Sequence, residues 1–163
     1  MMHWLMHVLM IGLLLAFMID GLTFLWVRRV YQIAYHIFIK VGGQVVFLDL
    51  DGLKQINDTF GHRTGDTVLR EVGKIFLWRS RARAFRYGGD EFVILLPRWS
   101  RESAENLACR MQQEISRVPV KMVGSDGLAV TVVNVAVSVG VGCSEEVADK
   151  NLYHNKNVNQ KPE

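Results

Sequence analysis

The sequence predicts an α/β (α+β) fold in which helices flank a central mixed β-sheet, with an apolar helix at the N-terminus. Short apolar runs, typical of buried strands, alternate with segments whose apolar residues recur at helical spacing. Paired glycines at positions 42–43 and 88–89 separate these segments, as is typical of the end of a helix and of a tight turn. Because 50% of the residues are hydrophobic and 21% are charged, a disordered or low-complexity chain is excluded.

The first predicted element is the apolar helix. Residues 1–19 contain no Asp, Glu, Lys or Arg, and residues 8–19 are apolar apart from one glycine. A helix that spans a bilayer needs about 20 such residues. Three interpretations stay open: a signal-anchor helix, a buried or interface helix, and a cleaved signal peptide. We therefore separate residues 1–19, a possible membrane anchor, from residues 20–163.

If residues 1–19 span a membrane, the flanking charges predict an orientation. Arg28, Arg29 and Lys40 follow the apolar segment, whereas no Lys or Arg precedes it. The positive-inside rule then places residues 20–163 in the cytoplasm. The missing basic residues before the segment, and the missing small-residue cleavage site after it, disfavour the signal peptide.

Helix and strand alternate in the next segments. Residues 22–40 are mixed apolar and predict a helix, which Gly42 and Gly43 end. Residues 44–50 are a short, mostly apolar run, which predicts a buried central strand. Residues 66–78 carry apolar side chains at helical spacing and predict a second helix.

Hairpins are predicted in the second half of the chain. Residues 84–87 and 92–96 flank a glycine pair, which predicts a hairpin with a tight turn. Ser100 fits the N-cap of a helix with apolar residues on one face. A second hairpin and a weak helical patch complete the prediction, at residues 118–123, 128–141 and 151–156.

Cysteine count and net charge exclude several functional classes. The two cysteines, Cys109 and Cys143, are too few for a disulfide-rich scaffold or a four-cysteine zinc site. The net charge of +3 is too small to indicate a nucleic-acid partner, so we predict none. The same charge suits an anionic small molecule.

Carboxylates stand at the ends of two predicted strands. Asp49 and Asp51 end the first strand, and Asp90 and Glu91 follow the glycine turn. Clustered carboxylates raise each other's pKa unless a cation neutralises them. Mg²⁺ binds a few carboxylates together with phosphate oxygens and water. The pattern predicts a magnesium–nucleotide site; the alternative is that each aspartate only closes a turn or caps a helix.

Two motifs carry a resemblance to a known family. Residues 87–92 read YGGDEF, and residues 49–62 read DLDGLKQINDTFGH, followed by Gly65 and Asp66. With these motifs in this order and spacing, the chain resembles the GGDEF diguanylate cyclases. Weaker matches extend the resemblance over roughly residues 20 to 160, at residues 20–23, 28–29, 137–141 and 148–153.

The resemblance implies a fold, a reaction and a location. The fold is a palm of the nucleotidyl-cyclase and polymerase type. The enzyme condenses two GTP molecules into cyclic di-GMP and releases two pyrophosphates, with Mg²⁺ or Mn²⁺ as cofactor. Each subunit of a homodimer holds one GTP, and the reaction takes place at the interface. With residues 1–19 as anchor, the protein would lie at the cytoplasmic face of a bacterial inner membrane; without it, in the cytoplasm.

The resemblance also implies roles for single residues. Asp49, Asp90 and the Leu50 carbonyl would bind the metal ion, and Asp90 and Glu91 would be needed for catalysis. Asp66 would select guanine, because it can accept from the ring N–H and the 2-amino group together. The substrate-binding positions that the resemblance implies are Leu53, Lys54, Asn57, Asp66, Gly88, Gly89 and Lys156.

Several positions depart from the family pattern. The inhibitory product site of the family is Arg-x-x-Asp, and this chain has Arg79 but Ala82 in place of the acid. A late arginine that assists phosphate binding is Gln160 here. The segments before residue 44 and between residues 142 and 148 are also short.

Two alternatives to the cyclase therefore stay open. One is a degenerate GGDEF domain that binds GTP or a protein partner without turnover. The other is a phosphatase of the haloacid-dehalogenase type, in which Asp49 would be the nucleophile; Leu53 and the lack of a late acidic pair weigh against it. A P-loop enzyme is excluded, because no lysine-bearing glycine loop is present.

Overall fold

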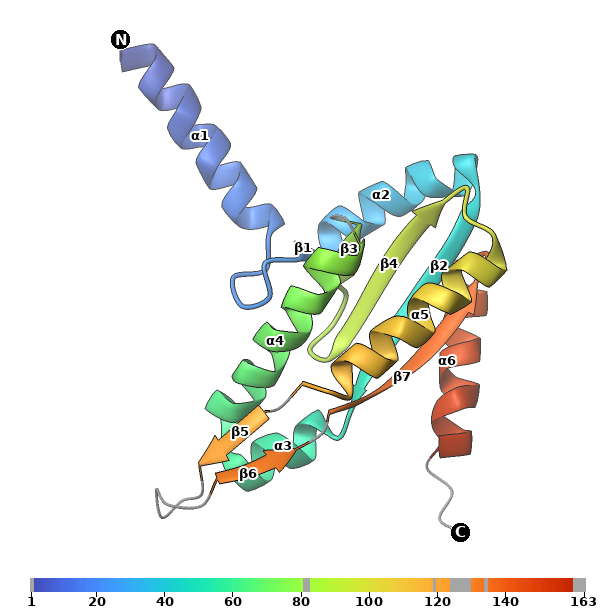
Figure 1. Ribbon diagram of the computed structural model, residues 1–163. Coiled ribbons are helices and arrows are strands. Elements are labelled where there is room, and N and C mark those ends of the chain that lie inside the picture. The colour runs from blue at the N-terminus through green and yellow to red at the C-terminus, as the bar shows by residue number, and fades with distance from the viewer. Residues whose placement is uncertain (1, 81–82, 119, 124–129, 134, 160–163) are drawn as a thin grey trace.

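The computed structural model describes residues 2–80, 83–118, 120–123, 130–133 and 135–159. Its centre is a five-stranded sheet in the order β1-β3-β4-β2-β7 (Figure 1). The strands are β1 (Trp26–Val27), β2 (Gly43–Asp51), β3 (Ala84–Arg86), β4 (Glu91–Pro97) and β7 (Ala136–Gly142). β1 runs parallel to β3, and the other neighbouring strands are antiparallel. The mixed sheet that the sequence predicts is therefore present.

Helices cover both faces of this sheet. The helices are α2 (Arg28–Val41), α3 (Leu53–Phe60), α4 (His62–Ser80), α5 (Arg101–Ile115) and α6 (Glu145–Asn159). One core cluster joins Val46 and Leu48 of β2 to α3, α4 and α5. The other joins Val45 and Phe47 to α2 and α6. Since successive strand residues point to opposite faces, β2 is buried on both sides, as its nearly continuous apolar run predicts.

α1 (Met2–Met18) lies within the segment for which an apolar helix is predicted. It projects away from the body of the protein (Figure 1), and its Trp4 and Phe17 side chains are exposed. Within the described part of the chain, no helix combines the length and the apolar character needed to cross a membrane.

The segment predicted as one helix over residues 22–40 is different in the structure. Only its second part is helical, because residues 21–23 form a turn and Trp26–Val27 is strand β1. The Asp20 carboxylate accepts hydrogen bonds from the Thr23 N–H at 2.9 Å and the Thr23 hydroxyl at 2.7 Å. Such a side-chain cap stabilises the turn and competes with helix formation. The predicted end at the glycine pair is correct: Gly42 closes α2 with a φ of 73°.

The second predicted hairpin is also different. Its long strand, predicted at 128–141, is two strands: β6 (Val130–Val133) pairs with β5 (Val120–Val123), and β7 joins the main sheet. The turn predicted at 124–127 lies outside the described residues. α3 is an additional helix that the predicted order of elements did not contain. Gly61 separates it from α4.

Glycines allow α6 to pack closely on β7. A side chain at Gly140 would overlap the Ala148 carbonyl oxygen and the Leu152 nitrogen, and one at Gly142 would lie 2.5 Å from the Ala148 nitrogen. The side chain of Asn151 also donates to the Val141 carbonyl of this edge strand at 2.8 Å. These contacts hold α6 against β7, and the last turns of the helix lie near the end of β2.

Candidate active site

Three of the predicted acidic residues meet where β2 and β4 pair. In the antiparallel register, Asp49 of β2 lies opposite Glu91 of β4. The Leu50 N–H donates to the Asp90 carbonyl at 3.1 Å, which holds the turn before β4 against the end of β2. The structure thus brings Asp49 and Leu50 together with Asp90 and Glu91, a pair that follows much later in the sequence.

Lys156 reaches this acidic cluster from α6. Its Nζ lies 2.7 Å from Asp49 Oδ1, and both side chains are largely buried. Burial raises the pKa of the Asp49 carboxyl; Lys156 lowers it and the neighbouring Asp90 and Asp51 raise it, with a net rise. The Glu91 pKa is also raised, by burial first and then by Asp49 and Asp90. In both groups the neighbouring carboxylates add to the rise that burial causes, and an added positive charge would offset their part of it.

The donor set fits a hard divalent cation. Carboxylates and a backbone carbonyl are the ligands that Mg²⁺ and Mn²⁺ bind, and Mg²⁺ completes its coordination with water and phosphate oxygens. Within the described residues, no three His, Cys, Asp or Glu side chains are grouped so that they alone could hold a metal ion. The predicted set contains two carboxylates and one carbonyl, so it depends on substrate and water for its other ligands.

Asp51 has a different partner. Its carboxylate accepts from the Ser138 hydroxyl of β7, at 3.0 Å to Oδ1 and 2.9 Å to Oδ2. This hydrogen bond fixes the last residue of β2 to the edge strand. Asp51 therefore supports the strand end that carries Asp49.

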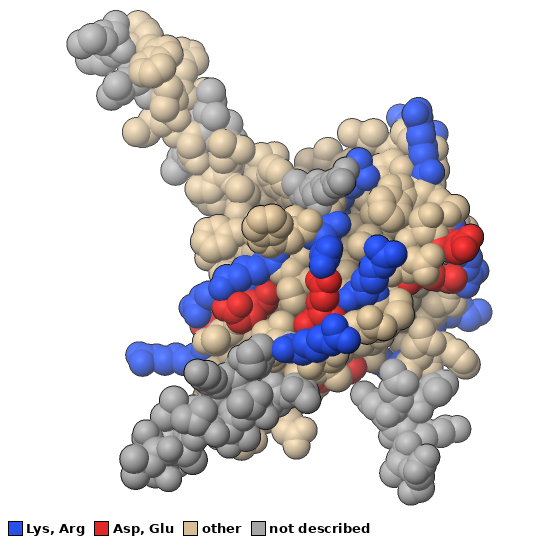
Figure 2. All heavy atoms as spheres, viewed as in Figure 1, with Lys and Arg blue, Asp and Glu red and all other residues tan. Residues whose placement is uncertain are grey.

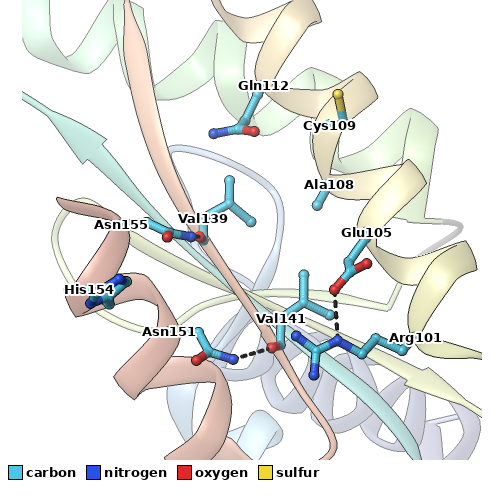
Figure 3. Close-up of a pocket in the computed structure, with 10 residues that line it drawn as sticks. All are labelled: Arg101, Glu105, Ala108, Cys109, Gln112, Val139, Val141, Asn151, His154 and Asn155. Atoms are coloured by element: carbon cyan, nitrogen blue, oxygen red, sulfur yellow. Dashed lines mark hydrogen bonds and ion pairs between the residues drawn. The ribbon is translucent and has the colours of Figure 1, made fainter. Parts of the chain in front are cut away.

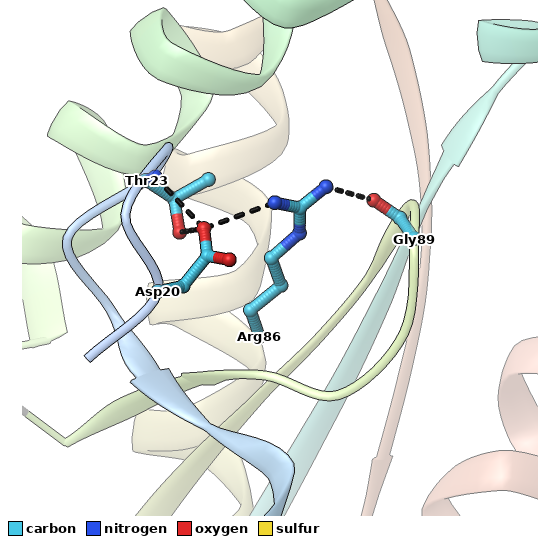
Figure 4. Close-up of polar contacts among 4 residues, drawn as sticks. All are labelled: Asp20, Thr23, Arg86 and Gly89. Atoms are coloured by element: carbon cyan, nitrogen blue, oxygen red, sulfur yellow. Dashed lines mark hydrogen bonds and ion pairs between the residues drawn. The ribbon is translucent and has the colours of Figure 1, made fainter. Parts of the chain in front are cut away.

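The turn before β4 is held by Arg86, a residue to which the sequence motifs assign no role. Arg86 donates to the Asp20 carboxylate at 2.9 Å and to the Gly89 carbonyl at 2.7 Å (Figure 4). The space at Gly88 is filled by the Glu91 carboxylate, which a side chain there would displace. Gly88 thus permits the position of Glu91, and Arg86 ties the turn to the segment that follows α1.

Leu53 and Lys54, two of the predicted substrate-binding positions, begin α3. Gly52 adopts a φ of 76° at the N-cap, a conformation that glycine adopts at no steric cost. Leu53 is buried in the core, so only its backbone can face a ligand, whereas Lys54 is exposed. The first N–H groups of a helix bind anions, and these N–H groups follow directly after the acidic end of β2.

Asn57 of α3 lies against Gly65 of α4, beside Asp66. The Asn57 Oδ1 atom occupies the space that a Gly65 side chain would need. This oxygen is buried and has no hydrogen-bond partner among the described residues. An unpaired buried polar atom is costly, and Gly65, against which this oxygen lies, directly precedes Asp66 in the sequence.

The predicted inhibitory site is only partly described. Ala82, where the family has an acid, lies outside the described residues, and so does Gln160. The Arg79 guanidinium pairs with Glu114 of α5, and its Nε donates to Glu114 Oε2 at 2.8 Å. In Figure 2, Lys and Arg side chains on this face are interspersed with Asp and Glu.

A separate pocket lies between α5 and α6, over the edge strand β7 (Figure 3). Its volume is about 310 Å³, and its lining includes Cys109, His154 and Asn155. None of the predicted site residues lines it. The carboxylates of the candidate active site are therefore not in this pocket.

The sequence model of the family described as "Diguanylate cyclase, GGDEF domain" matches residues 18–161. The chain is 36% identical over 115 residues to diguanylate cyclase DosC of Escherichia coli, covering 67% of this chain and 25% of that protein. It is 35% identical over 151 residues to the response regulator PleD of Caulobacter vibrioides, covering 84% of this chain and 33% of that protein. The chain thus spans a quarter to a third of the length of these two curated relatives.

Solved structures show the same fold. The coiled coil and GGDEF domain of DgcB from Caulobacter crescentus, in complex with c-di-GMP, superposes with a TM-score of 0.84 at 24% identity, over 94% of this chain and 87% of that one. Diguanylate cyclase SiaD from Pseudomonas aeruginosa, in complex with its activator SiaC, gives a TM-score of 0.78 at 26% identity, over 96% and 64%. The family match, the acidic strand ends and the shared fold agree, and the chain belongs to the GGDEF family.

Proposed function

We propose that this chain is a diguanylate cyclase that condenses two GTP molecules into cyclic di-GMP and two pyrophosphates. The observation that carries the proposal is the register of β2 and β4, which sets Asp49 opposite Glu91 with Asp90 beside Leu50. The raised pKa values of Asp49 and Glu91 support it, because perturbed carboxyls gather at functional sites.

Asp49, Asp90 and the Leu50 carbonyl would hold Mg²⁺ or Mn²⁺. When bound, the ion would lower the pKa of the attacking 3′-hydroxyl and offset the charge of the phosphates. Lys156 would exchange its Asp49 partner for a phosphate oxygen, and the N–H groups of Leu53 and Lys54 would hold the phosphates.

Recognition of guanine is proposed for Asn57 and Asp66. The unpaired Asn57 oxygen supports this role, since a guanine N–H can supply the missing donor. Glu91, whose proton affinity is raised, would help to accept the proton of the 3′-hydroxyl.

Dimerisation and membrane attachment are part of the proposal. Two GTP-loaded subunits that face each other would align each 3′-hydroxyl with the α-phosphate of the other GTP. The apolar α1 helix would attach the chain to the cytoplasmic face of a membrane. Its exposed side chains, Trp4 and Phe17 among them, support an apolar partner for this helix.

The proposal is tested by incubating the full chain with GTP and Mg²⁺ and separating the products by chromatography. Cyclic di-GMP from the wild type, lost in Glu91→Gln and kept in the exposed neighbour control Glu146→Gln, is the expected result. Saturable GTP binding without product would instead support the non-catalytic alternative. Release of phosphate from simple esters, lost in Asp49→Asn, would point to the phosphatase.

A further inference from the structure

Glu145, the first residue of α6, forms hydrogen bonds with tyrosines from two other parts of the chain. Its carboxylate accepts from the Tyr31 hydroxyl at 2.8 Å and from the Tyr87 hydroxyl at 2.9 Å. Its own N–H donates to the Tyr35 hydroxyl at 3.1 Å. Tyr31 and Tyr35 belong to α2, whereas Tyr87 follows β3, so the Glu145 carboxylate joins α6 to α2 and to the segment after β3.

The rings around Glu145 pack against one another. Tyr31 meets Tyr87 edge to face, with ring centroids 5.4 Å apart, and Phe47 meets Tyr87 at 5.2 Å. The Arg28 guanidinium lies 4.2 Å from the Tyr87 centroid and donates to the Tyr87 hydroxyl at 3.1 Å. Tyr87 is therefore fixed on its ring faces and at its hydroxyl.

Tyr87 directly precedes the turn of the proposed active site. Its N–H donates to the Glu91 carbonyl at 2.8 Å, on the opposite side of that turn. Glu145 thus contacts the residue at which the acidic turn begins. At the other end of α6, Lys156 contacts Asp49.

The proposed site has an acidic half and a basic half on different elements. The acids lie on β2, on the turn before β4 and at the first residue of β4, and Lys156 lies on α6. Only Cys143 and Ser144 connect β7 to α6, so the position of this helix depends on its packing and on contacts at its first residue. The hydrogen bond from Tyr87 to Glu145 ties α6 to the acidic half.

We infer that Glu145 is a positioning residue of the nucleotide site: by joining the start of α6 to Tyr87, it sets where Lys156 stands relative to the acidic turn. The inference rests on the proposed function, because the ligand it concerns is GTP. Glu145 touches no reacting group itself and acts through Tyr87 and Lys156.

Removal of Glu145 should change the affinity for GTP in opposite directions, depending on whether the residue acts through its charge or by positioning Lys156. Removing an acidic side chain near an anionic ligand strengthens binding of that ligand. Loss of a positioning residue weakens it, because Lys156 is no longer held in place. Glu146 is the matched control, since it is the next residue of α6 and carries the same charge. It also lines, together with Glu145 and Tyr87, a surface pocket that is separate from the one in Figure 3.

The test uses the full chain, Mg²⁺ and 3′-deoxy-GTP, which lacks the attacking hydroxyl and so binds without turnover. Affinity is measured by calorimetry for Glu145→Ala, Glu146→Ala, Lys156→Ala and the double variant Glu145→Ala/Lys156→Ala. We expect Glu145→Ala to weaken binding about tenfold, the size of one lost hydrogen bond to a charged group. Glu146→Ala should leave affinity unchanged or improve it.

The double variant shows how Glu145 acts. In the Lys156→Ala background, the added loss from Glu145→Ala should fall below about twofold, because residues that act through one another are not additive. Tyr87→Phe removes only the hydroxyl and should weaken binding like Glu145→Ala, while Glu145→Gln, which keeps an acceptor, should recover part of the affinity.

Three outcomes would overturn the inference. One is equal affinity of Glu145→Ala and Glu146→Ala, even with a lowered melting temperature, which would make Glu145 a fold-stabilising residue only. Another is an equal loss from Glu145→Ala with and without Lys156. If the wild type itself fails to bind 3′-deoxy-GTP, the proposed function fails and the inference fails with it.

Discussion

Lys156 Nζ lies 2.7 Å from Asp49 Oδ1, so a cation from the last helix already partners the carboxylate proposed to bind a metal ion. A divalent cation must compete with this ammonium group for Asp49. In the absence of nucleotide, Lys156→Met should therefore bind Mn²⁺ several-fold more tightly than the wild type, because the acidic cluster loses its own counter-charge. The free Mn²⁺ signal in electron paramagnetic resonance measures this.

Lys156→Met should also weaken the binding of GTP. Once the metal ion holds Asp49, Lys156 is free to contact a phosphate, and its loss removes one charged hydrogen bond, worth roughly tenfold in affinity. Lys150→Met changes an exposed lysine of the same helix and serves as the control. Unchanged Mn²⁺ affinity in Lys156→Met would show that the ion pair does not limit access of the metal.

Glu91 is predicted to reduce the stability of the metal-free protein at neutral pH. Its folded-state pKa is raised, through burial and then Asp49 and Asp90. An acid with a raised folded pKa contributes its stability below the unfolded value of 4.5 and loses it as the pH rises through the folded value. Glu91→Gln should thus match the wild type below about pH 4 and melt at a higher temperature at pH 7.

Thermal melting with a chelator, at pH 4 and pH 7, checks this prediction. In a chain of this size, each 1 kcal/mol shifts the melting temperature by about 2–4 °C. Glu102→Gln, at an exposed position of α5, is the control for a general charge effect. A Glu91→Gln variant less stable than the wild type at pH 7 would mean that this carboxylate makes a favourable contact in the folded state.

The sequence pattern predicted correctly those elements that are determined by residues close together in the sequence. The run over residues 44–50 forms strand β2, an interior strand next to the middle strand β4, and the glycine turn joins β3 and β4 as a hairpin. The Ser100 N-cap was also correct, since its hydroxyl accepts from the Ser103 N–H at 3.2 Å. In each case the residues that decide the structure are neighbours in the sequence.

Where distant residues decide, the sequence pattern was insufficient. Trp26 and Val27 sit in an apolar segment that reads as helix, but they pair with Phe85 and Arg86 as a short parallel strand. Residues 128–141 read as one strand, although the described segments within and beside this range, Val130–Val133 and Ala136–Gly142, belong to different sheets.

The candidate site shows the same division. The acids and Lys156 came from motifs, and the structure brings them together. The contacts of Arg86 with Asp20 and of Glu145 with Tyr87 join residues 66 and 58 positions apart, and no local signal marks them.

Gly65 is expected to control guanine binding with little effect on stability. A methyl group at this position would displace the Asn57 amide, the flexible end of a side chain, rather than backbone. Alanine is also the better helix former by about 1 kcal/mol. Gly65→Ala should therefore melt close to the wild type but raise the KM for GTP about tenfold.

Steady-state kinetics and thermal melting of Gly65→Ala, compared with Asn57→Ala, separate the two effects. If Gly65→Ala acts by moving the amide, both variants should raise KM by similar factors, and the double variant should add little. A fall in melting temperature with an unchanged KM would place the Asn57 amide outside the guanine site.

The Asp20 carboxylate is expected to stabilise the turn before β4 through Arg86. Burial alone would raise the Asp20 pKa, but hydrogen bonds from Thr23 and Arg86 lower it overall. An acid with a lowered folded pKa stabilises the protein above its unfolded value of 3.8 and loses that contribution as the pH falls through the folded value. Asp20→Asn should therefore lower the free energy of unfolding by about 1.5–3 kcal/mol at pH 7, the contribution of a charged hydrogen bond, and by little well below pH 3.8.

Urea unfolding at pH 7 and pH 3 measures this difference, with Asp58→Asn on the exposed side of α3 as control. Arg86→Gln should cost at least as much at pH 7, because it also frees the Gly89 carbonyl, to which Arg86 donates at 2.7 Å. Since the same guanidinium holds both groups, the double variant should be little worse than Arg86→Gln. Additive losses would instead mean that Asp20 acts through Thr23 alone, and that the segment after α1 does not hold the turn.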